Sequence, residues 1–150
     1  MRGAASIVAT AVALAAAPAN AFDPAGADII GLRLGMPEAA IVATIRNQGF
    51  AVSRDQGALL ARTRDGRLMI DVAGAQGAWR IRYVFTGHGP GEPEKIEAAI
   101  VDRFGPPDQA RPMAWCQAVG RDGLCPAHAP SLRFLPGSLT LLLQSGSEGP

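Results

Sequence analysis

Four side chains in this sequence are of types that could bind a metal or carry out redox chemistry: Cys116, Cys125, His88 and His128. Structural zinc sites need four such ligands in short, regular spacings, and the spacing between the two cysteines does not fit a zinc knuckle. The Cys-x-x-Cys spacing of redox-active pairs is also missing. We therefore expect no metal and no cofactor, and we interpret both histidines as loop residues. Two free thiols would instead point to a metal or redox carrier.

Hydrolytic chemistry has no signature in the sequence either. No serine lies in a Gly-x-Ser-x-Gly nucleophile elbow. The glycine-rich stretch from Gly87 to Gly91 is short, contains a proline and is not followed by Lys-Ser or Lys-Thr, so it does not fit a phosphate loop. Asp71, Glu92 and Asp102 could supply a pair of carboxylates, but nothing in the sequence selects two of them. We therefore predict no catalytic residues and leave enzyme activity open.

The first 21 residues have the pattern of a secretory signal peptide. Arg2 precedes a small and apolar stretch from Ala4 to Ala17, and Pro18-Ala19-Asn20-Ala21 follows, with small residues where signal peptidase reads the chain. The apolar stretch is shorter than the roughly 20 residues that cross a bilayer. We predict cleavage after Ala21, a periplasmic or secreted location, and one domain over residues 22–150 without a membrane span.

Charge and cysteine content fit an exported protein. The chain has 14 Lys and Arg against 13 Asp and Glu, and loss of Arg2 with the leader would make these counts equal. Nucleic-acid binding favours a basic excess, so we expect no nucleic-acid partner. In an oxidising compartment, Cys116 and Cys125 are expected to form a structural disulfide.

Two similar helices are expected to support any site. Pro37-Glu38 opens the first and Pro93-Glu94 the second, since proline suits the first helical position and glutamate the positive first turn. Gly49 and Gly105 end them. Apolar stripes run along both helices: Ile41, Ile45, Ile96, Ile100 and Phe104. The repeated caps and spacing predict two related half-units, at about residues 29–86 and 92–144.

Alternating residues predict strands after each helix, four after the first and three after the second. The clearest strand begins at Trp79, where Trp79, Ile81, Tyr83 and Phe85 alternate with Arg80, Arg82 and Val84. Asp65-Gly66 predicts a two-residue hairpin turn, and Pro136-Gly137 divides a final hairpin. The sequence therefore predicts an α+β domain in which two helices pack on one face of a mostly antiparallel sheet.

The stretch IIGLRLGMPEAAIVATIRNQGF, with YVFTG and IVDRFGPPD further along, resembles a group of small secreted bacterial domains. In that group a G-[IV]-x-[LVI]-G-M opening leads into a helix and an antiparallel sheet, and the matching residues here are Gly31, Leu32, Leu34, Gly35 and Met36. The group includes the SmpA/OmlA outer-membrane assembly lipoproteins and the beta-lactamase inhibitory proteins. The resemblance implies this architecture and a leaning towards protein binding. Pro37 and the missing lipidated Cys depart from the group's pattern, and no functional residue carries over.

One face of the predicted sheet is rich in arginine. The predicted hairpin places Arg64 opposite Arg67 and Arg62 opposite Met69, and Arg80 and Arg82 project away from the face of Trp79. We expect five arginines to share this face with Asp71: Arg62, Arg64, Arg67, Arg80 and Arg82. Arginine suits protein interfaces and carboxylate binding. An ordinary solvated sheet face is the alternative, and both tryptophans are more simply core residues.

These patterns favour a non-catalytic binding module that contacts another envelope or secreted protein through the arginine-rich face. The alternative is a small hydrolase or ligand-binding enzyme with a site between helix and sheet. A deep pocket lined by convergent polar groups would favour the enzyme, and a filled core beneath a flat exposed face would favour the binding module.

Overall fold

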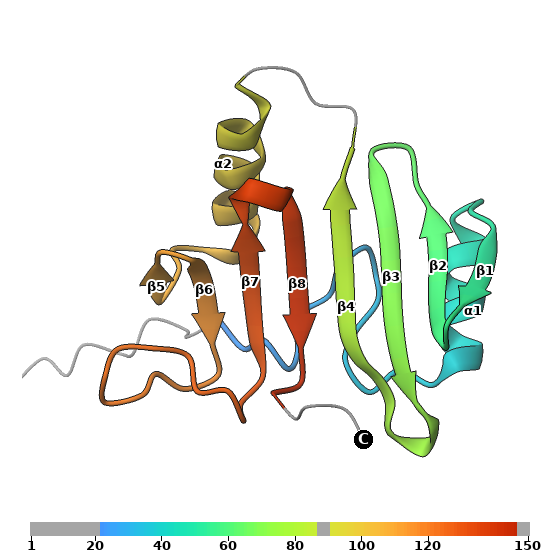
Figure 1. Cartoon of the computed structure of the whole chain (residues 1–150), viewed down its shortest axis with the longest axis horizontal. Coiled ribbons are helices and arrows are strands. Elements are labelled where there is room, and N and C mark those ends of the chain that lie inside the picture. Colours follow the sequence, from blue (N-terminus) through green and yellow to red (C-terminus); the bar gives the residue numbers. More distant parts are fainter. Residues whose placement is uncertain (1–21, 87–90, 147–150) are drawn as a thin grey trace, which may run out of the picture.

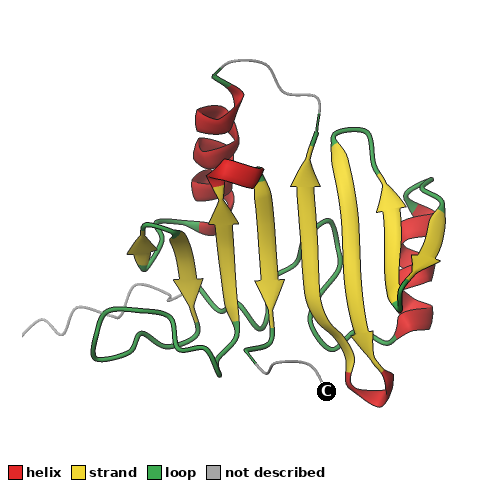
Figure 2. Cartoon of the chain, in the orientation of Figure 1, coloured by secondary structure: helices red, strands yellow, loops and turns green. Residues whose placement is uncertain are grey.

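A computed structural model describes residues 22–86 and 91–146 (Figure 1). Within these residues the fold is α+β, as predicted, with two α-helices and one antiparallel sheet of eight strands (Figure 2). The helices are α1 (Glu38–Asn47) and α2 (Glu92–Phe104). The strands are β1 (Val52–Asp55), β2 (Ala58–Arg62), β3 (Gly66–Ala73), β4 (Gly77–Phe85), β5 (Gln109–Ala110), β6 (Met113–Cys116), β7 (Ser131–Leu135) and β8 (Thr140–Gln144). The predicted signal peptide and His88 lie outside the described residues.

The strand order is β1-β2-β3-β4-β8-β7-β6-β5, so each helix is followed by four strands that pair in sequence. The two sets join where β4 pairs with β8, the last strand of each set. Both sets therefore form one continuous sheet. The two-residue strand β5 was not predicted, because two residues between Pro107 and Pro112 carry no periodic signal.

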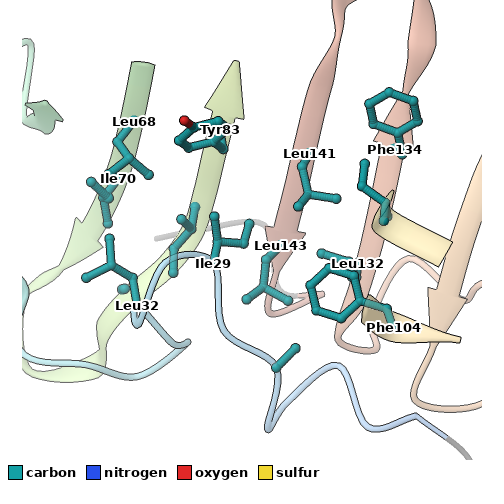
Figure 3. Close-up of a cluster of buried hydrophobic side chains, with 14 of the residues drawn as sticks. Ile29, Leu32, Leu68, Ile70, Tyr83, Phe104, Leu132, Phe134, Leu141 and Leu143 are labelled. Carbon is teal, nitrogen blue, oxygen red and sulfur yellow. The ribbon is translucent and has the colours of Figure 1, made fainter. Parts of the chain in front are cut away.

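The large buried apolar side chains of the sheet lie on one face, called the inner face here. Cross-strand partners form two rows on it: Leu59, Ile70, Ile81, Leu143, Leu132 and Trp115, and Ala61, Leu68, Tyr83, Leu141, Phe134 and Met113. Figure 3 shows members of both rows with Ile29 and Leu32 of the segment before α1. Ile41, Ile45, Ile96, Ile100 and Phe104 belong to the same cluster, so the predicted helix stripes are buried.

The segment before α1 is bound to the start of β4. The Gly35 N–H donates to the Ala78 carbonyl oxygen at 2.7 Å, and the Ala78 N–H donates to the Met36 carbonyl oxygen at 2.9 Å. Leu32 is completely buried in the core. Gly77 lies so close that a Cβ there would be 2.5 Å from the carbonyl oxygens of Gly35 and Met36. The Gly35-Met36 pair thus fixes the point at which β4 begins.

The turn between β2 and β3 is shifted by one residue from the prediction. Arg62 pairs with Arg67, and the Thr63 N–H donates to the Gly66 carbonyl oxygen at 2.9 Å. The central turn residues are therefore Arg64 and Asp65. Gly66 belongs to β3, where a Cβ would lie 2.6 Å from the ring of Tyr83. This glycine is needed for close packing rather than for the turn.

The predicted disulfide is present. Cys116 and Cys125 are joined, with their Cα atoms 5.2 Å apart. Cys116 ends β6, and Figure 2 shows neither helix nor strand in the chain from there to β7. The bond therefore ties this irregular segment back to the sheet.

Candidate binding surface

The second face of the sheet, called the outer face here, is formed by the side chains that alternate away from the core. The large side chains on this face are half-buried or exposed, and only small side chains on it are fully buried. The central ones are Leu60, Arg62, Arg67, Met69, Asp71, Arg80, Arg82, Val84, Ser131, Arg133, Leu135, Thr140, Leu142 and Gln144. The outer face thus mixes arginine with leucine, methionine and valine.

Asp71 holds two of these arginines in place. Its carboxylate accepts a hydrogen bond from Arg80 Nε at 2.6 Å and a second, longer one from Arg82 at 3.3 Å. The Asp71 side chain is only 17% exposed, and those of Arg80 and Arg82 are 34% and 33% exposed. A guanidinium has five N–H donors, so both arginines keep donors for another acceptor. The ion pairs therefore orient the two guanidinium groups and leave some of their N–H donors available.

A β-bulge brings Trp79 to this site. Asp71 pairs with Arg80 and Val72 pairs with Ala78, which leaves Trp79 without a partner on β3. Ala78 and Ile81 are both buried on the inner face, so the two residues between them turn outwards. The Arg80 guanidinium carbon lies 4.4 Å from the centroid of the Trp79 ring. The prediction that Trp79 faces away from Arg80 is therefore wrong, because it assumed unbroken alternation.

A half-buried row crosses the middle of the outer face. Met69, Arg82, Leu142 and Arg133 are successive cross-strand partners on β3, β4, β8 and β7. The Nε atoms of Arg82 and Arg133 and the Oγ atom of Ser131 are buried and have no hydrogen-bond partner among the described residues. A buried donor without a partner costs about 1–3 kcal/mol. Water or a bound molecule could supply the missing partners of these three atoms on the outer face.

The remaining predicted arginines differ in their placement. Arg62 and Arg67 lie directly opposite each other on the outer face and are exposed, and like charges in such a pair repel. Arg64 lies in the turn instead, so it is not part of the face. Arg133 takes part in the face but was not predicted. The alternation in SLRFL could have shown that Arg133 lies on the face opposite Leu132 and Phe134. Only the strand order β4-β8-β7 places it near Arg82.

The outer face has an excess of positive charge. Five arginines and two aspartates alternate onto it, counting Asp55 of the edge strand β1: Arg62, Arg67, Arg80, Arg82, Arg133, Asp55 and Asp71. Within residues 22–86 and 91–146, Arg62, Arg67 and Arg133 make no ion pair. A surface with this charge would attract carboxylates and repel cations.

The residues considered for catalysis do not come together. Asp71 lies on the outer face with Arg80, whereas Glu92 begins α2 and binds Lys95 at 3.0 Å. Asp102 is exposed on α2. No three His, Cys, Asp or Glu side chains in the described part of the chain form a possible metal site. None of the helices described is both long and apolar enough to cross a bilayer.

A cavity of about 430 Å³, called the α2 cavity here, lies beside α2 at the inner face. Its apolar walls come from α2, from β4 and from the segment before α1, and include Ile29, Tyr83, Phe85, Ile96, Ile100 and Phe104. Arg103 binds Asp28 at 3.0 Å, and with the pair of Lys95 and Glu92 it forms part of the cavity's charged lining. This is the helix–sheet site that an enzyme or ligand-binding role would use.

Comparison with known proteins assigns neither surface a role. No protein-family model matches the sequence, and searches of curated proteins and of solved structures find no significant similarity.

Proposed function

We propose that this chain is a non-catalytic binding module, exported to the periplasm or secreted, that binds an acidic surface of another envelope or secreted protein through its outer face. The observation that carries this proposal is the outer-face row of Arg82, Leu142 and Arg133, together with Arg80 and the Trp79 ring that Arg80 contacts. Tryptophan and arginine are the residues most often responsible for binding energy at interfaces, particularly when they are already partly desolvated.

The geometry of the cluster favours a carboxylate-bearing partner. Asp71 fixes the guanidinium groups of Arg80 and Arg82 before any partner arrives, which lowers the entropy cost of binding. Leu142 lies between Arg82 and Arg133 in the same row and offers apolar contact at the centre. Planar guanidinium groups bind carboxylates in bidentate geometry. Aspartate and glutamate side chains of a partner would therefore fit this surface.

The location and the class of function rest on the sequence together with the disulfide. The signal-peptide pattern and the Cys116–Cys125 bond both favour an oxidising compartment outside the cytoplasm. The resemblance of the Gly31–Met36 opening to secreted protein-binding domains supports a binding role. The hydrolase alternative is weaker, because four of the five charged side chains that line the α2 cavity pair with one another.

The test is site-specific photocrosslinking in intact cells, with a photoreactive residue in place of Leu142. We expect a discrete adduct with one protein whose crosslinked peptide is rich in aspartate or glutamate. The triple variant Arg62→Glu, Arg67→Glu and Arg133→Glu should abolish the adduct, since it reverses charge on the outer face without breaking an ion pair.

The matched control changes net charge by the same amount away from this face, through Arg33→Glu, Arg46→Glu and Arg121→Glu. All three arginines are exposed and lie outside the strands. The adduct should survive in the control. An adduct that persists in the outer-face variant, or that disappears equally in both triple variants, contradicts the proposed surface.

A further inference from the structure

We propose that the α2 cavity binds a small amphiphile with an apolar body and a single cationic group. This site is separate from the outer face, and the proposal does not depend on the proposed function. It follows from the size of the cavity, the chemistry of its walls and the balance of charge around it.

The cavity has the dimensions and lining of a small-molecule site. Its volume of about 430 Å³ falls within the range of about 300–1,000 Å³ typical of ligand pockets. Tyr83 and Phe85 of β4 pack edge to face, with ring centroids 4.8 Å apart, and both line the cavity. Ile96, Ile100 and Phe104 line it from α2. Burial of an apolar chain against these side chains supplies the driving force for binding.

The charges around the cavity select the head group. Among its charged lining residues, Arg103 pairs with Asp28 and Lys95 pairs with Glu92, so both cations are already neutralised. The remaining charged residue of the lining is Asp65, whose carboxylate makes no hydrogen bond or ion pair with a described residue. The lining therefore carries one uncompensated negative charge, which favours a cation and disfavours an anion.

The position of Asp65 is fixed by the backbone around it. Its carbonyl oxygen accepts a hydrogen bond from the Thr86 N–H at 3.0 Å, which ties the β2–β3 turn to the residue after Phe85. The hydroxyl groups of Thr63 and Tyr83 are 2.7 Å apart and bind the same turn to the cavity wall. The carboxylate thus belongs to a turn anchored at the cavity rather than to a free loop.

Helix α2 leaves an opening in the charged rim. Lys95, Ala99 and Arg103 are spaced four residues apart and lie along one side of the helix, next to the buried row of Ile96 and Ile100. Ala99 lines the cavity between two long charged side chains and is itself exposed. Its small side chain leaves room for a ligand to enter, and a larger residue there would obstruct the entry.

The experiment measures binding of three probes that share one chain length, n-octylamine, n-octanol and octanoate, by isothermal titration calorimetry on the exported chain. We expect octylamine to bind one molecule per chain, and octanoate to bind at least tenfold more weakly. Asp65→Asn should weaken octylamine binding about tenfold, the effect of losing one charge-assisted contact, and leave octanol unchanged. Ala99→Phe should abolish binding of all three probes.

Ala98→Phe is the matched control, because Ala98 is exposed on α2 and does not line the α2 cavity. Both substitutions carry the same change in helix propensity, so a difference between them reports on the cavity. The proposal is overturned if no probe binds saturably, if octanoate binds as tightly as octylamine, if Asp65→Asn has no effect, or if Ala99→Phe and Ala98→Phe behave alike. The outer-face arginine variants should retain octylamine binding, which separates this result from a failure of the proposed function.

Discussion

Substitution of Gly77 by alanine tests whether the segment before α1 is pressed against the start of β4. The backbone of Gly77 has φ 72° and ψ −154°, a conformation open almost only to glycine. The added Cβ would also lie 2.5 Å from two backbone carbonyl oxygens, those of Gly35 and Met36. Gly105 has nearly the same conformation, with φ 81° and ψ −177°, and an added Cβ there meets nothing within 4 Å. Gly105→Ala is therefore the matched control for backbone strain.

The size of the expected effect follows from this comparison. Both variants incur about 1–3 kcal/mol of backbone strain. In Gly77→Ala the clash must also separate Gly35 and Met36 from Ala78, with the loss of two hydrogen bonds that contribute about 1 kcal/mol each. We expect Gly77→Ala to lower the free energy of unfolding by about 2 kcal/mol more than Gly105→Ala does.

Urea denaturation followed by tryptophan fluorescence measures this difference, provided that the m-values of the two variants agree. A Gly77→Ala protein that fails to fold, beside a folded Gly105→Ala protein, is the extreme form of the expected result. An equal decrease in the free energy of unfolding in the two variants would refute the contact between the segment before α1 and β4. That contact bears on the proposed binding surface, because Ala78 directly precedes the bulge that turns Trp79 outwards.

Two further predictions concern the outer face and the disulfide. A double-mutant cycle with Asp71→Asn and Arg80→Gln should give a coupling energy of about 1 kcal/mol, which is at the upper end for a partly exposed ion pair. The coupling is measured from unfolding midpoints in low salt. A coupling near zero would show that Asp71 does not hold Arg80 in place. Reduction of the Cys116–Cys125 bond should cost about 2–3 kcal/mol of stability, because the bond closes a short loop; an unchanged melting temperature after reduction would contradict a structural role.

The helices and most strands could be predicted because their signals are local. Pro37, the stripe of Ile41 and Ile45, and Gly49 all lie within one short segment, and the structure buries both isoleucines. The alternation in Ile81 and Tyr83 is equally local, and both side chains are in the core. Each of these patterns depends only on the periodicity of one element, which the sequence displays directly.

The errors arose where distant residues decide the local structure. Asp65-Gly66 has the sequence of a tight turn, but Gly66 is required by the ring of Tyr83 from the neighbouring strand. Trp79 continues the alternation of β4 in sequence, but the pairing of Val72 with Ala78 inserts a bulge beside it. Tertiary contacts override local propensity at both places, and neither contact can be read from one strand alone.

The order of the strands also explains why the outer face could be predicted only in part. Arg82 lies on the last strand of the first four-stranded set, and Arg133 lies on the third strand of the second set. They share a row only because β8 pairs with β4 and places Leu142 between them. The two sets repeat the same topology, yet the residues that meet at their junction are unlike: an arginine on β4 faces a leucine on β8. The repeated helix-and-strand unit therefore supplies the frame, whereas the proposed binding surface comes from the difference between its two copies and exists only once they are joined.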